Sequence, residues 1–493
     1  MHARSVLSVV SGPFGGALLF LGLHHLPGAQ AAMAGVVLWM AVWWITEAVP
    51  LAVTALLPVV LYPLFGITGL PQVAAYYGRD VIFLFLGGFL LALGIERSGL
   101  HRRIALHIVH RVGASPSQLV LGCLLATGLL SMWINSTAAV LVMLPIAMGL
   151  LSAAPGHERL GAALALAVGY GATIGGMATP VGTPPNLVFM EQWRQFFPER
   201  APIGFGQWML FGVPFAVLYL LLTWLLMTKV VFRMPGKATM DRHALRTEMK
   251  ALGTPTRDEV LASIVFGITA VLWITGDDIV LSDTTTLHGW RHWTGLEALG
   301  DPAVAMMGGI LLFVIPSKVP IVHGQPAAAD HPRALLDWDF AQARIPWGVV
   351  LLIGSGFAIA GGLDASGLSA GIGQALAGWR TGSEVGQVVA IAAGVTLLSE
   401  LGSNTAVASL VLPILARTAG VWGMVPQSVM IPATLAASCG FMLPIASPMQ
   451  AIVFSSGQLS VRRMVQAGVW MDALGVLLLT GLWSLLGALV FGN

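Results

Sequence analysis

Apolar segments long enough to cross a lipid bilayer recur along almost the whole chain, and they restrict its possible folds more than any other feature. A helix needs about 20 mostly apolar residues to span the hydrocarbon core. Only 9% of the 493 residues are charged, against about 25% in soluble domains, so charged side chains are too few to cover a water-facing surface of this size. The apolar runs therefore predict a polytopic membrane protein made of helices, because only helices and closed barrels satisfy their backbone polar groups in lipid.

Several classes of protein are excluded by what the sequence lacks. The formal net charge is +2 and no basic run is interleaved with aromatic residues, so nucleic acid is not an expected partner. Both cysteines lie inside apolar runs, which argues against a disulfide framework. No phosphate-binding loop, nucleophile elbow, dinucleotide fingerprint or zinc ligand set is present, so no enzymatic activity is predicted. The first apolar run, 12–23, is interpreted as a helix, not as a cleaved signal peptide, because no small-residue cleavage motif follows it.

The basic residues in the links predict the orientation of the chain in the membrane. The links 96–111 and 229–257 are rich in arginine and lysine and are expected in the cytoplasm, as are Arg462 and Arg463. The links 191–200 and 276–300 carry no such excess and are expected outside. This pattern places the carboxy terminus outside, and the bacterial inner membrane is the expected location.

The chain also contains an internal repeat. Gly88 to Leu100 aligns with Gly356 to Leu368 at an offset of 268 residues, and Asn135 to Ala138 aligns with Ser403 to Ala406 at the same offset. After four residues are dropped, Pro180 to Asn186 aligns with Pro444 to Gln450. A fixed offset kept over this length indicates two related halves.

The link that follows Ser-Gly-Leu is basic in the first half, and its counterpart in the second half is not. The two halves are therefore expected to cross the membrane in opposite senses, as in the inverted repeats of secondary transporters. The predicted divisions are 1–79, amino-terminal scaffold helices numbering two or three; 80–232, first repeat; 233–257, cytoplasmic linker; 258–345, scaffold helices and linker; and 346–493, second repeat.

Each half contains two places where small polar residues, glycine and proline interrupt an apolar segment. They are 131–137 and 171–186 in the first half, and 399–405 and 438–450 in the second. One serine or glycine alone more often only packs or kinks a helix, but four interruptions at matched positions favour a binding site. Unwound backbone at membrane depth lines a cavity, where free carbonyls can ligate a cation and helix N-termini can hold an anion.

No lysine, arginine or histidine lies in or beside these interruptions. An anion bound there would therefore be balanced by helix ends, by hydroxyl and amide donors, and by bound cations. Sodium held by carbonyl and hydroxyl oxygens fits this requirement, and no organic cofactor is expected.

Together with three further segments, these motifs resemble the divalent anion/sodium symporter family, the INDY-type carboxylate transporters, over nearly the whole chain. The further segments are Trp44 to Pro58, the FLFLGGF segment from Phe83, and Cys439 to Pro448. The resemblance implies about 11 transmembrane helices plus two re-entrant hairpins, an elevator-type alternating-access mechanism and a homodimer in the lipid bilayer.

The resemblance also implies the site residues. The substrate ligands would be Asn135, Ser136, Thr137, Thr183, Pro184, Ser403, Asn404, Thr405, Ser447 and Pro448. The sodium ligands would be Ser131, Asn135, Ser136 and Gly182 at one site, and Ser399, Ser403, Asn404 and Ala446 at a second. Glu400, three residues before the second tip, could orient that tip by hydrogen bonding.

Two positions depart from the family pattern. The first hairpin tip reads Asn135-Ser136-Thr137 where the family has Ser-Asn-Thr, so one amide is displaced by a residue. The stretch from Ser447 reads Ser-Pro-Met-Gln where the family usually has Thr-Pro-Pro-Asn. The displaced amide could still reach the same anion, or it could disturb the first sodium site.

The sequence therefore predicts a sodium-coupled symporter of small dianions, with C4-dicarboxylates such as succinate, malate and fumarate as the leading substrates. Two alternatives stay open at this stage. One is a sodium-independent dicarboxylate exchanger. The other is a sodium-coupled transporter of citrate, sulfate or another oxyanion on the same fold.

Overall fold

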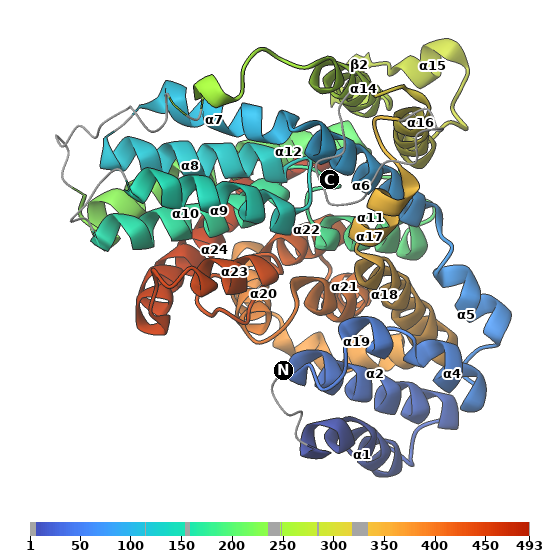
Figure 1. Cartoon of the computed structure of the whole chain (residues 1–493). Coiled ribbons are helices and arrows are strands. Elements are labelled where there is room, and N and C mark those ends of the chain that lie inside the picture. The colour runs from blue at the N-terminus through green and yellow to red at the C-terminus, as the bar shows by residue number, and fades with distance from the viewer. Residues whose placement is uncertain are drawn as a thin grey trace.

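A computed structural model describes residues 6–492, apart from residues 114, 153–157, 235–246, 248, 283–284 and 318–333. The described chain is almost entirely helical (Figure 1). Its only strands are β1 (Ile279–Ser282) and β2 (Thr285–Leu287), which pair antiparallel in one small hairpin. The all-α fold class expected from the apolar runs is confirmed.

The amino-terminal part contains five helices where two or three were expected. They are α1 (Val6–Gly22), α2 (Gly28–Thr46), α3 (Leu51–Thr54), α4 (Leu57–Leu64) and α5 (Leu70–Tyr76). The short helices arise because prolines remove backbone donors and restrict the preceding residue. The chain bends after α2, where Glu47 adopts a left-handed conformation with φ of 46° and Pro50 follows.

The two halves of the repeat form the same helices in the same order. The first half consists of α6 (Asp80–Ser98), α7 (Leu100–Val112), α8 (Pro116–Ser131), α9 (Ser136–Ser152), α10 (Glu158–Gly176), α11 (Pro184–Phe196), α12 (Phe205–Leu225) and a π-helical turn η1 (Leu226–Val231). The second half consists of α18 (Trp347–Ser366), α19 (Leu368–Leu376) with a 3₁₀ turn η2 (Ala377–Trp379), α20 (Glu384–Glu400), α21 (Asn404–Val421), α22 (Pro426–Ala436), α23 (Pro448–Ser455) and α24 (Val461–Phe491). The repeat found in the sequence is thus a repeat of helices, and their relative orientation in a membrane stays a prediction.

The Ser-Gly-Leu motif makes the same turn in both halves. Gly99 ends α6 with φ of 81°, and Gly367 ends α18 with φ of 75°, a left-handed conformation that glycine adopts without a steric penalty. In the first half the Ser98 hydroxyl donates to Ile95 O at 3.0 Å and accepts from the backbone N–H of Leu100. Ser366 makes the equivalent pair of hydrogen bonds in the second half.

Between the halves lie α14 (Arg257–Ile274), the β1–β2 hairpin, α15 (Trp290–Thr294), α16 (Asp301–Val314) and α17 (Trp338–Arg344). Helix α16 packs directly on α6, where Gly87 permits the close approach: a Cβ at this position would lie 2.5 Å from Ala305 Cβ. The link 258–345 therefore contributes helices that support α6.

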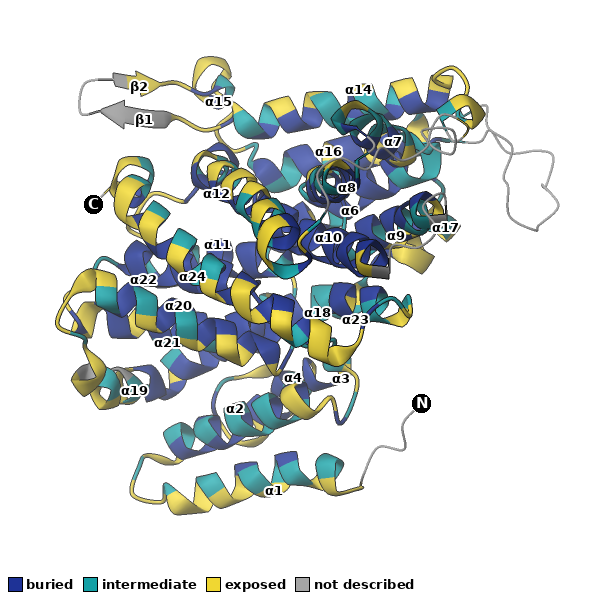
Figure 2. Ribbon diagram, turned by 90° about the vertical axis from the view of Figure 1, so that its left-hand side faces the viewer, coloured by how far each residue is buried: buried dark blue, intermediate teal, exposed yellow. Residues whose placement is uncertain are grey.

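Six helical stretches in the described residues are long and apolar enough to cross a membrane. They are Gly28–Thr46, Leu70–Ser98, Phe205–Val231, Trp347–Ser366, Asn404–Val421 and Val461–Phe491. Large apolar side chains also stay exposed on the outer helices, for example Leu477 and Leu485 of α24. Exposed segments recur along the ribbons of α1 and α24 (Figure 2). Such an apolar exterior suits lipid, and the chain is an integral membrane protein. The count of about 11 spans and the division into scaffold and repeat domains remain predictions.

Candidate functional site

One cavity of about 440 Å³ lies where the four interrupted segments meet. Its lining residues come from the turns before α9 and α21, the stretches before α11 and α23, and helices α3, α6 and α18. They are Pro50, Leu51, Ala52, Phe85, Phe89, Asn135, Ser136, Thr137, Val181, Gly182, Thr183, Pro184, Pro346, Gly348, Val349, Leu352, Ser403, Asn404, Thr405, Ser447, Pro448 and Met449. All ten residues expected to contact substrate are among them, although they lie up to 313 positions apart in sequence (135 to 448).

The apolar side of this cavity was not anticipated from the sequence. Phe85 and Phe89 of α6 contribute an aromatic face, with ring centroids 5.3 Å apart. Leu51, Val349 and Leu352 extend this apolar face from α3 and α18. The FLFLGGF motif carried the only available signal for Phe85 and Phe89, because their spacing of four residues puts both on one helix face.

Four helices begin at the cavity, and their N-terminal residues all line it: Ser136 of α9, Pro184 of α11, Asn404 of α21 and Pro448 of α23. The N-terminus of a helix carries a partial positive charge and unpaired N–H groups, so it favours an anion. No lining residue is lysine, arginine, histidine, aspartate or glutamate. The cavity therefore offers an anion helix ends and polar donors, but no cationic side chain.

A first cluster of oxygen atoms lies at the tip of the α8–α9 hairpin. Ser131 Oγ is 2.7 Å from Ser136 Oγ and 2.6 Å from the carbonyl oxygen of Ala172. Ser136 Oγ is also 3.3 Å from Gly182 O. Because Gly176 has no side chain, the space beside these oxygen atoms stays open: a Cβ at this position would lie 3.0 Å from both Ser136 Oγ and Gly182 O. An oxygen-only set of hydroxyls and carbonyls is the donor chemistry expected for sodium.

A second cluster occupies the matching place at the tip of the α20–α21 hairpin. Ser399 Oγ lies 2.9 Å from Asn404 Oδ1 and 2.5 Å from Ala437 O. Gly440, which aligns with Gly176 at an offset of 264 residues, lies between Ser399 and Ala446: a Cβ there would be 3.1 Å from Ser399 O and 3.2 Å from Ala446 Cβ. The structure thus brings together Ser399, Asn404 and Ala446, three of the four ligands expected for the second sodium site, whereas the fourth, Ser403, lines the cavity.

Three of the expected sodium ligands do not line the cavity. Ser131, Ser399 and Ala446 are fully buried behind the tips, whereas Ser136, Gly182 and Asn404 belong to both the oxygen clusters and the cavity wall. The two oxygen clusters therefore touch the cavity through shared residues. An ion in either cluster would lie next to an anion in the cavity.

The two tips differ in the residue that faces the oxygen cluster. In the second half this residue is Asn404, which brings an amide. In the first half it is Ser136, which brings a hydroxyl, while Asn135 serves as the cap of α9 by accepting the backbone N–H of Thr137 at 2.8 Å. The displaced amide of the first tip thus points to a helix end, and the first oxygen cluster remains intact without it.

The unwound stretches are tied to the hairpins by polar groups. In the first half the Thr179 hydroxyl donates to Met132 O at 2.5 Å. The Asn186 amide donates to Thr179 O at 2.8 Å and also reaches two neighbouring carbonyls. Gln450, the counterpart of Asn186, is fully buried, and neither of its amide atoms has a hydrogen-bond partner among the described residues. The halves therefore secure equivalent stretches by different contacts.

In the second half the side chain of Glu400 joins the hairpin to the unwound stretch before α23. Its two carboxylate oxygens accept the backbone N–H groups of Met442 and Leu443 at 2.8 and 2.9 Å. At an offset of 268 residues Glu400 matches Met132, the residue whose carbonyl receives Thr179. The supporting role expected for Glu400 is therefore directed at the unwound stretch 442–443, and no hydrogen bond from its side chain to the tip residues 403–405 is formed.

Replacing Glu400 with alanine is expected to destabilise the protein and weaken the second sodium site. Two partly buried N–H groups would lose their acceptor, at a cost of up to about 1–3 kcal/mol each. Thermal unfolding in detergent should show a lower midpoint, and sodium should protect less against heat. Glu384→Ala is the control, because Glu384 is exposed on the first turn of the same helix. Equal unfolding midpoints for Glu400→Ala and the parent would contradict this role.

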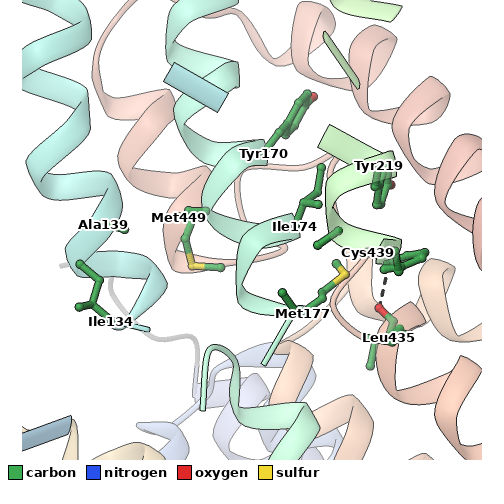
Figure 3. Packing of buried hydrophobic residues seen from close by; sticks show 14 of the residues in the cluster. Ile134, Ala139, Tyr170, Ile174, Met177, Tyr219, Leu435, Cys439 and Met449 are labelled. Atoms are coloured by element: carbon green, nitrogen blue, oxygen red, sulfur yellow. Dashed lines mark hydrogen bonds between the residues drawn. The ribbon is translucent and has the colours of Figure 1, made fainter. Parts of the chain in front are cut away.

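Both tips rest on a closely packed core. Ile134 and Ala139 flank the first tip, and Ile174 of α10, Met177 just after α10 and Met449 of α23 lie nearby (Figure 3). Tyr170 of α10 contacts Phe441 edge to face, with ring centroids 5.1 Å apart. Interiors packed in this way hold polar groups in fixed positions, so the geometry of the tips is set by the core behind them.

Comparison with known proteins gives one consistent result. The family model described as "Sodium:sulfate symporter transmembrane region" matches residues 18–491. The sodium-dependent dicarboxylate transporter SdcS of Staphylococcus aureus strain RF122 is 37% identical over 97% of this chain and 90% of that protein. The same transporter from strain NCTC 8325 is 36% identical over the same shares.

Two solved transporter structures share the fold. MtrF of Neisseria gonorrhoeae, described as an antimetabolite efflux pump, has a TM-score of 0.57 and 12% identity, over 95% of this chain and 96% of that one. The YdaH transporter of Alcanivorax borkumensis has a TM-score of 0.57 and 15% identity, over 94% of this chain and 100% of that one. At these identities the likeness concerns the fold alone. The resemblance noted from the sequence motifs is confirmed, and the comparisons found transporters, in agreement with the absence of a predicted enzymatic activity.

Proposed function

The chain belongs to the sodium:sulfate symporter family, and from this membership we propose that it is a sodium-coupled symporter of small dianions, with C4-dicarboxylates such as succinate as its main substrates. The observation that carries the proposal is the cavity on which four helix N-termini and both hairpin tips converge, with an oxygen cluster behind each tip. The S. aureus relative named as a sodium-dependent dicarboxylate transporter supports the same assignment.

The charge of the ligands explains why sodium is required. A dianion placed among helix ends and neutral donors gains too little compensation to lose its hydration, because no cationic side chain lines the cavity. Two sodium ions, one in each oxygen cluster, would neutralise a dianion. Binding of the ions and the anion is then mutually favourable, and each raises the affinity for the other by the same factor.

The placement of polar donors and of the apolar face favours a dicarboxylate over a single oxyanion. Each half supplies its own set of donors, with Thr137 and Thr183 in the first and Asn404 and Thr405 in the second. A ligand with two carboxylates can engage both sets at once, and the apolar face that includes Phe85 and Phe89 suits the carbon chain between them. Sulfate has no apolar part to place against this face.

Uptake into proteoliposomes tests the function. Radiolabelled succinate should accumulate under an inward sodium gradient, and excess unlabelled malate or fumarate should compete with it. Sulfate or citrate uptake with no succinate uptake would assign the protein to another substrate of the same fold. Succinate counterflow that is equally fast without sodium would replace symport with exchange.

Transport in this proposal proceeds by elevator-type alternating access in a homodimer. The two halves of the chain cross the bacterial inner membrane in opposite senses, and the carboxy terminus lies outside. The basic links 96–111 and 229–257 support this orientation. Both native cysteines are buried, so a Gly492→Cys variant offers one accessible thiol. A membrane-impermeant maleimide should label it on intact cells, and labelling only after the cells are permeabilised would reverse the orientation.

Restoring the family order in the first tip is expected to change substrate selectivity. In the double variant Asn135→Ser, Ser136→Asn, the new serine can cap α9 and the new asparagine would face the first oxygen cluster as Asn404 faces the second. A site that pairs its buried donors with a ligand discriminates strongly against ligands that leave them unpaired. Competition by a panel of dianions should therefore give different rank orders for parent and variant, and an identical rank order would show that the order Asn-Ser does not set selectivity.

A further inference from the structure

Three side chains with metal-ligating atoms lie close together outside the cavity, and none of them lines it. Asp278 follows α14, His288 precedes α15, and His292 lies within α15. One nitrogen of each imidazole and one Asp278 oxygen all lie within 4.8 Å of one another. Helix α15 lies at the edge of the helical body (Figure 2), and all three side chains are exposed to solvent.

Backbone contacts hold the two segments of the cluster together. Trp290 donates its backbone N–H to Thr275 O at 2.9 Å, and Gly289 donates to Asp278 Oδ1 at 2.8 Å. Gly289 passes so close to the backbone of Gly276 that no side chain fits between them. The first Asp278 oxygen is thus fixed by the backbone, and the second, Oδ2, is left for the histidines.

A buried arginine anchors the same loop. Arg291 donates to Asp277 and Asp301, both at 2.5 Å, and to Leu299 O at 2.8 Å. It is 6% exposed, so it joins the ends of α14 and α16 from inside the loop. Because Arg291 lies between the two histidines in sequence, this anchor also fixes the turn that presents them.

Two of the separations within the cluster lie on either side of the distance expected between ligands of a small tetrahedral metal. His288 Nδ1 lies 2.8 Å from Asp278 Oδ2, and His292 Nδ1 lies 3.8 Å from the same oxygen. Ligand bonds of about 2.0 Å at tetrahedral angles place neighbouring ligand atoms about 3.3 Å apart, between these two values. The imidazole rings stack with centroids 4.0 Å apart, and Trp293 closes one side with its ring edge-on to both.

We propose that Asp278, His288 and His292 form a binding site for a divalent transition metal of the zinc class. The ion replaces the proton shared by His288 Nδ1 and Asp278 Oδ2, and water completes the coordination on the exposed side. Two imidazoles and one carboxylate select zinc, copper or nickel over sodium, magnesium or calcium, which prefer oxygen ligands only. The site is separate from the two oxygen clusters behind the hairpin tips, which offer no nitrogen ligand.

Zinc titration of the full-length, tag-free protein in detergent tests the site. After treatment with a chelator, the parent should bind one zinc ion per chain in a calorimetric titration at neutral pH. His288→Ala or His292→Ala should weaken binding at least about tenfold, and the double variant should abolish it. Asp278→Asn should also weaken binding while its side-chain oxygen can still accept the Gly289 N–H, so the loop remains folded.

The matched control is the double variant His24→Ala, His25→Ala. These two histidines are also exposed and adjacent, but their rings lie 6.0 Å apart and no carboxylate joins them in the described structure. The control should bind zinc as the parent does. Cobalt added in place of zinc should give visible absorption bands of a low-coordinate ion, and the bands should be missing in His288→Ala, His292→Ala. Absence of zinc binding by the parent, or equal binding by both double variants, would overturn the proposal.

Discussion

Replacing Asn404 with alanine is expected to lower sodium-driven succinate uptake at least about tenfold without unfolding the protein. Asn404 lines the cavity, begins α21 and shares the second oxygen cluster with Ser399. Its amide is the group at this tip that can serve the ion through its oxygen and the anion through its N–H. A hydrogen bond to a charged group contributes about 1.5–3 kcal/mol, which corresponds to at least a tenfold loss.

Ser409→Ala provides the control on the same helix. Ser409 is fully buried, lies more than one turn beyond Asn404 and does not line the cavity. This variant should transport as the parent does. Thermal unfolding of both variants shows whether each remains folded. Parent-like uptake by Asn404→Ala would mean that the second tip is structural only.

Filling the space beside the first oxygen cluster should have an effect of similar size. In Gly176→Ala the new methyl group would lie 3.0 Å from Ser136 Oγ and from Gly182 O, in the space that an ion would use. The sodium concentration for half-maximal uptake should rise at least about tenfold, since the oxygens can no longer close around an ion. Sodium titration of uptake at saturating succinate measures this shift.

Two further glycines complete the experiment. Gly440→Ala places a methyl group against Ser399 O and Ala446 at the second cluster and should raise the sodium requirement as well. Gly394→Ala, on α20, meets no atom within 4 Å and should leave sodium dependence unchanged. A sodium requirement that is the same in Gly176→Ala and Gly394→Ala would exclude the first cluster as an ion site.

The sequence predicted the polar residues that line the cavity better than the contacts that hold them in place. All ten residues that the family resemblance implied line the cavity. The segments that carry them were visible in the sequence itself, because interrupted helices leave a local pattern of serine, glycine and proline and the repeat pairs each pattern with a second copy. These signals are local or fixed by one offset. Asn135 and Ser136 could be recognised as exchanged for the same reason.

Contacts between distant segments could not be predicted. Glu400 binds the backbone of residues 42 and 43 positions away, and nothing in its own segment specifies which N–H groups it will meet. The apolar face formed by Phe85 and Phe89 depends on how α6 packs against α16 and α18. Asp278 and His288 become neighbours only because the chain between them turns back as a hairpin, where the sequence indicated an outward-facing link and no more.

The most direct test of sodium-coupled dianion binding is a calorimetric titration of succinate into the purified protein, in sodium chloride and in choline chloride of equal ionic strength. The cavity has no cationic side chain and an oxygen cluster behind each tip, so succinate should bind in sodium and give no measurable binding in choline. Equal affinity in the two salts would contradict symport and leave a sodium-independent exchanger.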